Sequence, residues 1–260
     1  MQALLNTAVK AARKGGDLAL RYLNRVGDLE VRSKARNEFV TQVDQAAEAA
    51  IIGSIRERYP QHAILAEESG KHAGNEFTWI IDPLDGTTNF IHGFPVFSVS
   101  IALEVHGQLE VGVVYDPCRQ ELFTTTRGGG AQLDGRRIRV SSWPGLEGSL
   151  IGTGFPYRSN TQWLPKYMPM LQAVMENTAG VRRPGSAALD LCYVAAGRLD
   201  GFWEFGLSIW DIAAGTLMIR EAGGIATSLT PGQELAESGN IIAGSPKVHA
   251  ALQQLLADHL

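Results

Sequence analysis

A strand-like run that ends directly in two carboxylates constrains this chain more than any other feature. The apolar residues of 79–82 predict a buried strand, and its last residue, Asp82, is followed three positions later by Asp85. Pro83 has no N–H group for regular pairing, so the strand is expected to end there, while Gly86 lets the backbone turn or approach a ligand closely. The alternative is an ordinary turn of the Asp-Pro and Asp-Gly kind.

The rest of the first half combines two helices with consecutive strands. Helical spacing of apolar residues predicts a helix over 2–24 and another over about 41–58, where Thr41 and Asp44 resemble a capping box. Hairpin turns are expected at residues 106–107 and 134–135. Further strands are expected at 63–69, 97–105, 108–116, 121–126, 130–133 and 136–140.

The second half alternates strands and helices. Strands are expected at 149–155, 201–205 and 240–244. Helices are expected at about 160–177 with interruptions near Pro165 and Pro169, at 187–197 with Ser186 as N-cap, at 211–224, and from Ser245 onward. This pattern predicts a mixed α and β fold in layers, with two lobes in one unit and no flexible linker. We place the lobes at about 1–140 and 141–260.

Length and composition bound the class of protein. The chain has 260 residues, enough for one large domain or two small ones with a sizeable core. Hydrophobic residues make up 45% and charged residues 19%, which excludes an intrinsically disordered chain. The formal net charge of −4 indicates no overall attraction to nucleic acid or to anionic membranes, so no direct DNA binding is expected.

The chain is expected to be cytoplasmic. No run approaches the roughly 18 apolar residues that a membrane span needs, and the N-terminus does not have the pattern of a signal peptide. The two cysteines, Cys118 and Cys192, form no motif, which is typical of a protein from a reducing compartment.

The oxygen atoms of Asp82 and Asp85 suit a hard divalent cation. Magnesium prefers near-octahedral oxygen ligands, usually carboxylates completed by water and substrate phosphate. The N–H groups of Gly86, Thr87 and Thr88 are then available to a phosphate oxygen. The residues therefore indicate a magnesium site that handles a phosphate.

Other acids fall at positions that suit either a metal site or a plain structural role. Glu67 and Glu68 end another expected strand, where a metal or a solvated loop relieves their mutual repulsion. Asp211 opens an expected helix and Asp44 lies at the start of another, so each, taken alone, is better explained as a helix cap.

Three conspicuous patterns are interpreted as structural. The glycine-rich run 128–135 lacks the strand-then-helix context of a nucleotide-binding loop and is expected to be a hairpin. The histidines show no paired spacing for zinc, and the cysteines are expected to be packing residues. Arg182 and Arg183, just before Pro184, are expected to be a solvated or subunit-interface pair rather than a phosphate patch.

Four segments together carry a family pattern, in order and spacing over almost the whole chain. They are 39–44 (FVTQVD), 67–69 (EES), 82–90 (DPLDGTTNF) and 210–224, which runs from Trp210-Asp211 to EAGG. With these segments the chain resembles the inositol monophosphatase family of magnesium-dependent, lithium-sensitive phosphatases, and most of all its bacterial members of the extragenic-suppressor type. The resemblance implies the layered α/β sandwich of that family, with residues 1–260 as a single catalytic unit.

The resemblance also implies a set of metal ligands. One Mg²⁺ is expected on Glu67, Asp82 and the carbonyl of Leu84. A second is expected between Asp82, Asp85 and Asp211, and a third, looser ion on Glu67 and water. Ala66 stands where many relatives have glycine, which is a mild change of the backbone.

The remaining site residues follow from the same resemblance. The attacking water is expected near Glu67 and Thr87, with Asp44 behind Thr87, and the phosphate at the N–H groups of Gly86 and Thr87. Lys34 matches a mobile-loop lysine of the family only with a slip of one residue, so we leave it out of the site. Substrate hydroxyls are expected to meet Asp85, Asp211, Glu204 and the backbone near Ala187.

The expected function is hydrolysis of myo-inositol 1-phosphate and related alcohol phosphates by metal-activated water, in line and without a phosphoenzyme. Alternatives within the superfamily are a nucleotide 3′,5′-bisphosphate, fructose 1,6-bisphosphate or histidinol phosphate. An alternative of another class is a non-catalytic role, because relatives of the suppressor type join RNA polymerase antitermination complexes. A homodimer is also expected from the resemblance.

Overall fold

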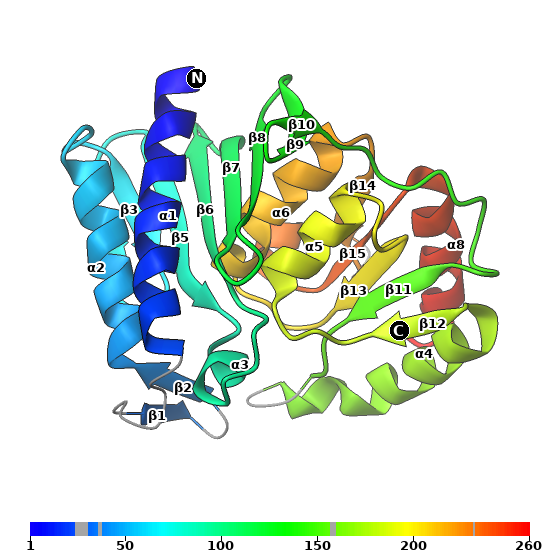
Figure 1. The fold of residues 1–260 in the computed structure, drawn as a ribbon. Helices are drawn as coiled ribbons and strands as arrows, with labels where there is room; N and C mark the ends of the chain where they lie inside the picture. Colours follow the sequence, from blue (N-terminus) through cyan, green and yellow to red (C-terminus); the bar gives the residue numbers. More distant parts are fainter. Residues whose placement is uncertain (24–30, 36–37, 157–159, 231) are drawn as a thin grey trace.

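The helices and strands of the protein form five layers in a computed structural model (Figure 1). The structure describes the chain except for residues 24–30, 36–37, 157–159 and 231, and for residues 31–40 it describes the backbone alone. Two helices cover one face of a large sheet, two more helices lie between that sheet and a smaller one, and the last two long helices cover the far side of the smaller sheet. The mixed α and β sandwich that the sequence predicts is confirmed.

The large sheet has eight strands in the order β10-β9-β8-β7-β6-β5-β3-β4, and only the pair β3 and β5 is parallel. Its strands are β3 (Ala63–Ala66), β4 (Gly70–His72), β5 (Phe77–Asp85), β6 (Ser98–Val105), β7 (Gln108–Asp116), β8 (Glu121–Thr126), β9 (Gly130–Leu133) and β10 (Arg136–Arg137). A separate hairpin pairs β1 (Val31–Ala35) with β2 (Glu38–Thr41).

The smaller sheet has five strands in the order β12-β11-β13-β15-β14. The strands β12, β11 and β13 run parallel to one another, and β15 is antiparallel to both of its neighbours. The bounds are β11 (Leu150–Thr153), β12 (Gly180–Arg182), β13 (Gly201–Glu204), β14 (Ile225–Ser228) and β15 (Ile241–Gly244).

The helices pair up by layer. The outer pair on the large sheet is α1 (Gln2–Leu23) and α2 (Gln42–Arg56), the central pair is α5 (Ala187–Ala195) and α6 (Ile209–Glu221), and the outer pair on the small sheet is α4 (Leu164–Asn177) and α8 (Pro246–Ala257). Shorter helical turns are α3 (Thr87–Ile91), the 3-10 turn η2 (Thr161–Trp163) and α7 (Leu235–Ser238).

Alternation along β5 divides its side chains between two hydrophobic cores. Trp79 and Ile81 pack in the core that α1 and α2 cover, whereas Ile80 packs in the core around α5 and α6. Asp82 therefore follows Ile80 onto the α5 and α6 side. A third core lies between the small sheet and α4 and α8.

Several element boundaries differ from those expected from the sequence. The prediction that the strand ends at Pro83 is wrong, because β5 continues to Asp85 with a register shift between Asp82 and Asp85. The helix expected at 211–224 begins earlier, at Ile209, so Asp211 does not open it. The strand expected at 136–140 pairs only over Arg136–Arg137.

The helix α4 is not interrupted at its second proline. Pro165 lies in the first turn, where the missing N–H group costs nothing, but Pro169 lies inside the helix. The buried face of Tyr167, Met170 and Val174 packs in the core against the small sheet, and this burial holds the helix through the proline.

The short elements β1, β2, β4, β12, β14, α3 and α7 were not expected. The division into lobes near residues 141–148 stays a prediction, although the chain passes from the large to the small sheet between β10 and β11. Among the helices of the described part of the chain, none is both long and apolar enough to span a membrane.

Candidate active site

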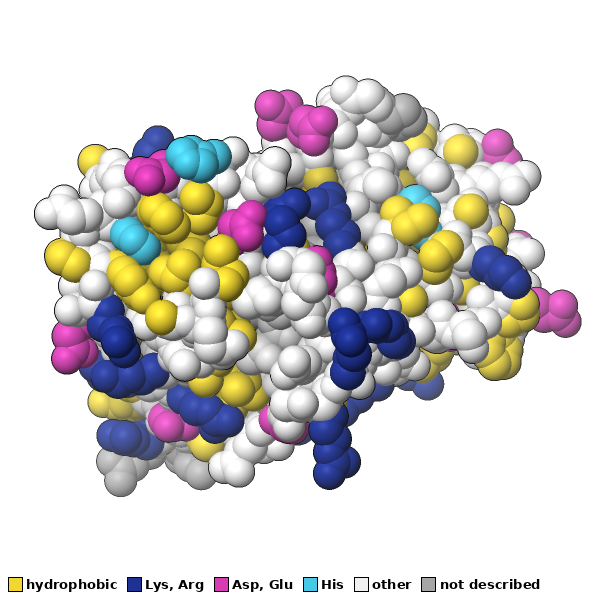
Figure 2. Space-filling view, turned by 90° about the horizontal axis from the view of Figure 1, so that it is seen from above, with side chains coloured by type: hydrophobic (Ala, Val, Ile, Leu, Met, Phe, Trp, Pro, Cys, Tyr) yellow, Lys and Arg dark blue, Asp and Glu magenta, His cyan; other side chains and the backbone are white. Residues whose placement is uncertain are grey.

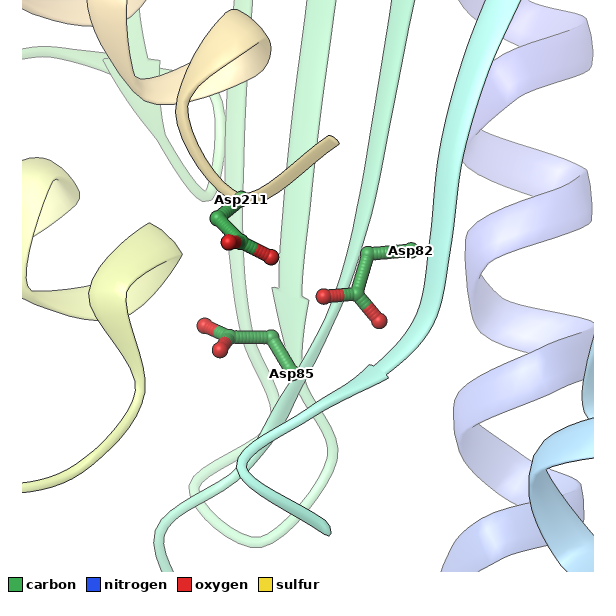
Figure 3. Close-up of side chains that lie close together, drawn as sticks. All are labelled: Asp82, Asp85 and Asp211. Atoms are coloured by element: carbon green, nitrogen blue, oxygen red, sulfur yellow. The ribbon is translucent and has the colours of Figure 1, made fainter. Parts of the chain in front are cut away.

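Three carboxylates from distant parts of the chain meet at one place between the large sheet and α6. Asp82 and Asp85 come from β5 and Asp211 comes from the first turn of α6. Each offers an oxygen atom, and these atoms all lie within 4.8 Å of one another. Figure 3 shows the three side chains turned toward a common space.

A β-bulge brings Asp82 and Asp85 to the same face of the sheet. Asp82 pairs with Ser100 and Asp85 with Ser98, so two residues of β5 lie opposite the single Val99 of β6. Without the extra residue, positions three apart would point to opposite faces. The bulge is held from within, because the N–H group of Leu84 donates to Asp82 Oδ1 at 2.9 Å. Pro83, which has no N–H group, suits the unpaired position.

Asp211 reaches the cluster from the start of α6. The N–H group of Ser208 donates to Asp211 Oδ2 at 2.7 Å, which is a capping-box contact with Ser208 as the N-cap, whereas the sequence alone suggests Asp211 itself as the cap that opens the helix. The hydroxyl of Ser100 donates to the carbonyl of Trp210 at 3.1 Å and ties this end of the helix to β6. The residue therefore caps its helix and also belongs to the carboxylate cluster.

Asp85 joins the cluster to α5. Its Oδ2 accepts hydrogen bonds from the hydroxyl of Ser186 at 2.6 Å and from the N–H group of Ala188 at 2.8 Å. Ser186 holds the N-cap position of α5 as expected, but its side chain makes no cap bond to that helix. Asp85 thus supplies the acceptor that the first turn of α5 needs.

Burial and mutual repulsion dominate the electrostatics of the cluster. Burial raises the pKa of Asp82 well above its usual range, and the charges of neighbouring acids, with that of Glu67 first, raise it further. Burial raises the pKa of Asp85 to about 6, against the hydrogen bonds from Ser186 and α5 that lower it. For Asp211, burial and then the charge of Asp85 raise the pKa to about 8.

These carboxylates fit a divalent metal ion. The donor set is all oxygen, which is what Mg²⁺ prefers. A bound dication would also reverse the raised pKa values, because it favours the ionised form of each acid. Glu67 lies just after β3 and lines the same cavity, although it is not one of the three acids that lie within 4.8 Å.

Thr87 and Asp44 are in contact. Asp44 is buried in the first turn of α2, and the hydroxyl of Thr87 lies 3.1 Å from both Asp44 Oδ1 and the carbonyl of Leu84. The N–H group and the hydroxyl of Thr41 donate to Asp44 Oδ2 at 2.8 and 2.6 Å, so the expected capping box is present. Burial raises the pKa of Asp44, and the bonds from Thr41 lower it.

The first and second halves of the chain are in close contact at Gly86 and Asn89. Gly86 has a φ of 102°, which disfavours any other residue, and a Cβ atom there would lie 3.2 Å from the carbonyl of Gly185. The amide of Asn89 donates to the carbonyl of Pro184 at 2.9 Å. The 82–90 segment thereby positions the chain that leads into α5.

A cavity of about 360 Å³ opens over the carboxylates and is lined by both halves of the chain. Apart from Asp44, which lies behind Thr87, it contains every residue that the sequence assigned to the site. They are Glu67, Asp82, Leu84, Asp85, Gly86, Thr87, Ala187, Glu204 and Asp211. The side chain of Lys34 lies outside the described residues.

Glu204 lies at the end of β13 and lines the same cavity as the carboxylate cluster. Its carboxylate lies against Gly154, where a Cβ atom would overlap the carboxylate oxygens. Gly154 is therefore the residue that makes room for Glu204.

Two charged residues that line the cavity were not assigned to the site from the sequence. Arg183, expected at the surface or at a subunit interface, lines the cavity, and its guanidinium carbon lies 5.2 Å from the ring centre of Phe155. Asp190 is 1% exposed, lines the cavity one helical turn after Ser186, and burial raises its pKa well above the usual range. An acid inside the apolar run 187–195 was the available signal for Asp190.

The glycine-rich run is a hairpin, as expected. β8 and β9 are antiparallel, and the N–H groups of Gly128 and Gly130 both donate to the carboxylate of Glu221 at 2.8 Å. These groups are therefore occupied by the protein itself rather than available to a nucleotide. Cys118 and Cys192 form no disulfide, and burial raises the pKa of both thiols.

Comparison with known proteins places the whole chain in one group. The sequence profile of the inositol monophosphatase family matches residues 1–260. A relative from Pseudomonas aeruginosa named Nus factor SuhB is 51% identical over 265 residues, which covers 100% of this chain and 98% of that protein. The crystal structure of the extragenic suppressor protein SuhB from Bartonella henselae has a TM-score of 0.96 at 44% identity, covering 99% and 100% of the two chains. An inositol monophosphatase from Anabaena has a TM-score of 0.87 at 41% identity, covering 99% and 96%.

Proposed function

The chain belongs to the inositol monophosphatase family, and we propose that it is a Mg²⁺-dependent phosphomonoesterase that hydrolyses myo-inositol 1-phosphate and related alcohol phosphates. Family membership supports a phosphatase of this superfamily. The observation that carries the finer proposal is the cluster of Asp82, Asp85 and Asp211 in a cavity that Glu204 also lines.

Two or three Mg²⁺ ions would be held by oxygen atoms of the cluster, of Glu67 and of the Leu84 carbonyl. Bound Mg²⁺ would neutralise the phosphate dianion, lower the pKa of water and stabilise the leaving alkoxide. The raised pKa values of the acids support this assignment. Burial and mutual repulsion disfavour the ionised form of these acids, and a bound cation would compensate for both effects.

The residues beside the cluster position the reactants. In this proposal Thr87, whose hydroxyl is held by Asp44, and Glu67 orient the attacking water in line with the bond to be broken. The backbone N–H groups of Gly86 and Thr87 face the phosphate oxygens. Asp85, Asp211, Glu204 and the backbone near Ala187 accept or donate hydrogen bonds to the substrate hydroxyls.

The charges at the alcohol end favour an uncharged polyol over a second phosphate. Arg183 is the only cationic side chain among the described residues that line the cavity, and it shares this end with the acids Glu204 and Asp190. A bisphosphate would bring two further negative charges to a place without a surplus of positive charge. Nucleotide 3′,5′-bisphosphate and fructose 1,6-bisphosphate are therefore the less favoured substrates.

A substrate panel tests this function. The purified protein is expected to hydrolyse inositol 1-phosphate with Mg²⁺, faster than the two bisphosphates and histidinol phosphate. Activity should be lost after chelation and regained with Mg²⁺, while Ca²⁺ and lithium should inhibit. Full activity in excess EDTA would rule the proposal out.

The relatives named Nus factor SuhB support a second candidate, a role as a protein partner in transcription antitermination. Complementation of a bacterium that lacks its own relative, using the Asp82→Asn variant, separates the two. Growth with this inactive variant would favour the partner role, and failure would favour catalysis.

We also expect a cytoplasmic homodimer, and light scattering that gives the 28.1 kDa mass of one chain at micromolar concentration would reject the dimer.

A further inference from the structure

A buried glutamate on α2 holds the backbone next to Glu67. Glu48 is 3% exposed, and its two carboxylate oxygens accept hydrogen bonds from the N–H groups of Glu68 at 2.8 Å and Ser69 at 2.9 Å. The N–H group of Glu67 itself donates to the carbonyl of Ile81 on β5 at 3.1 Å. Three consecutive N–H groups, beginning at Glu67, are therefore fixed by the protein.

Burying a carboxylate in this way is costly unless its oxygens are well satisfied. Among the residues that the structure describes, no ion pair includes Glu48, so its partners are the two backbone N–H groups. Hydrogen bonds to an ionised acceptor are stronger than neutral ones and restrain the groups that donate them. The two hydrogen bonds thus replace the water that an exposed Glu48 carboxylate would bind. They restrain one short segment of backbone, the segment that follows β3 and carries Glu67.

The same helix also controls Thr87. Asp44 lies one helical turn before Glu48 on α2, and its carboxylate contacts the hydroxyl of Thr87 at 3.1 Å. The helix is fixed in turn against α1, where Gly15 leaves room for Ile51. One face of α2 therefore contacts Thr87 and the backbone adjacent to Glu67, the two residues that the proposed mechanism assigns to the attacking water.

We propose that Glu48 is a positioning residue that fixes the direction of the Glu67 carboxylate and thereby sets the Mg²⁺ affinity of the site. This inference rests on the proposed function, because it requires Glu67 to bind metal. Residues that orient metal ligands from behind commonly change metal affinity by about 10- to 100-fold when substituted. If Glu48 only stabilised the backbone at Glu68 and Ser69, its substitution would change the melting temperature and leave the metal affinity unchanged.

Calorimetric titration with Mg²⁺ and Mn²⁺ electron paramagnetic resonance test this role without relying on activity. In Glu48→Gln, an amide NH₂ group faces one of the two backbone N–H groups, so one hydrogen bond is lost. We expect the Mg²⁺ dissociation constant to rise about 10-fold, with kcat at saturating Mg²⁺ largely restored. Glu48→Asp keeps the charge but shortens the reach, and an intermediate rise is expected.

The matched control is Glu57→Gln, which removes the same charge at the C-terminal end of the same helix. Glu57 is exposed, lies 3.7 Å from Lys10 and is not among the residues that line the cavity, so Mg²⁺ binding should equal that of the parent. If both Glu48 variants bind Mg²⁺ as the parent does, the inference is wrong and the proposed function stands. If the parent itself binds no divalent metal, the proposed function fails, and the inference with it.

Discussion

Asp85 accepts a hydrogen bond from the N–H group of Ala188 at 2.8 Å, across 103 positions of sequence. A carboxylate of the large sheet therefore caps the first turn of α5, and the hydroxyl of Ser186 donates to the same oxygen at 2.6 Å. The proposed metal site and the central helix layer are thus joined through one side chain. Substitutions at the N-terminus of α5 should therefore change the Mg²⁺ affinity of the proposed metal site.

Ser186→Ala tests this connection. The substitution removes a donor from Asp85 and leaves the bond from Ala188, so Asp85 is less well oriented and Mg²⁺ affinity should fall about 10-fold by calorimetry. Ser98→Ala is the control, because the Ser98 hydroxyl contacts the hydroxyl of Ser186 at 3.2 Å and reaches Asp85 only through it. An equal loss in both variants would contradict the direct role of Ser186.

The stability of the metal-free protein should fall as the pH rises from about 4 to 8. The folded-state pKa values of Asp85 and Asp211 are raised from 3.8 to about 6 and about 8. The folded state therefore holds more protons than the unfolded state in this range, and the free energy of unfolding decreases with pH. Each unit of pKa difference corresponds to about 1.4 kcal/mol of unfolding free energy.

Thermal melts in EDTA at pH 6 and pH 8 measure this effect. Between these values the decline comes mainly from Asp211, with a smaller part from Asp85, so Asp211→Asn should flatten it. Saturating Mg²⁺ should reduce the difference as well, because the bound cation favours the ionised acids. A metal-free protein that melts at a higher temperature at pH 8 than at pH 6 would show that burial and mutual repulsion do not raise the pKa values of these acids.

Asp82→Asn should abolish most of the activity. Asp82 is buried at the centre of the cluster and is assigned to two metal ions, so both should be weakened. We expect kcat to fall about 10³-fold or more, equivalent to roughly 4 kcal/mol of transition-state stabilisation. Steady-state kinetics over a range of Mg²⁺ concentrations measures this, and a variant that retains more than a tenth of the parent kcat would remove Asp82 from the proposed role.

Asp44→Asn should behave differently. Asp44 contacts Thr87 rather than the proposed metal ions, so Mg²⁺ affinity should stay nearly intact while kcat falls. Parallel calorimetry and kinetics on Asp44→Asn and Asp82→Asn compare the two roles. Loss of metal binding to the same degree in both variants would show that Asp44 acts on the metal site itself.

Glu204→Ala should separate recognition of the alcohol from phosphate chemistry. Hydrogen bonds to a charged group are worth about 1.5–3 kcal/mol, so kcat/KM for inositol 1-phosphate should fall roughly 10- to 100-fold. With 4-nitrophenyl phosphate, which has no ring hydroxyls, the variant should act almost as the parent does. A parallel fall for both substrates would move Glu204 into the catalytic machinery.

Gly154→Ala offers an independent check of the same residue. A Cβ atom at position 154 would overlap the Glu204 carboxylate, so the side chain must move. The variant should lose selectivity for inositol 1-phosphate in the same direction as Glu204→Ala while leaving Glu204 in the chain. Unchanged selectivity would mean that the position of the Glu204 carboxylate does not matter for the substrate.

Long periodic elements were predictable from the sequence alone. The helices α1, α2 and α8 and the hairpin of β6 and β7 repeat their apolar residues over many positions, and burial of one face outweighs local detail. The capping box of Thr41 and Asp44 was predictable because it depends on residues three apart. Short strands such as β12 and β14 were not, because three or four residues carry too little pattern to be told from a loop.

The sequence by itself determined which side chains are candidates for the chemistry: the acids in DPLDGTTNF, in EES and after Trp210 offer the oxygen ligands that magnesium prefers. Only the tertiary structure decided how they meet. The bulge after Pro83 turns Asp85 to the same face as Asp82, and the packing of α6 on that face adds Asp211. Asp190 enters the cavity for the same reason, because it lies on α5, which packs on the large sheet, and Arg183 enters it from the segment between β12 and α5. Local spacing cannot specify such contacts, since they depend on pairing and packing between residues that lie a hundred positions apart.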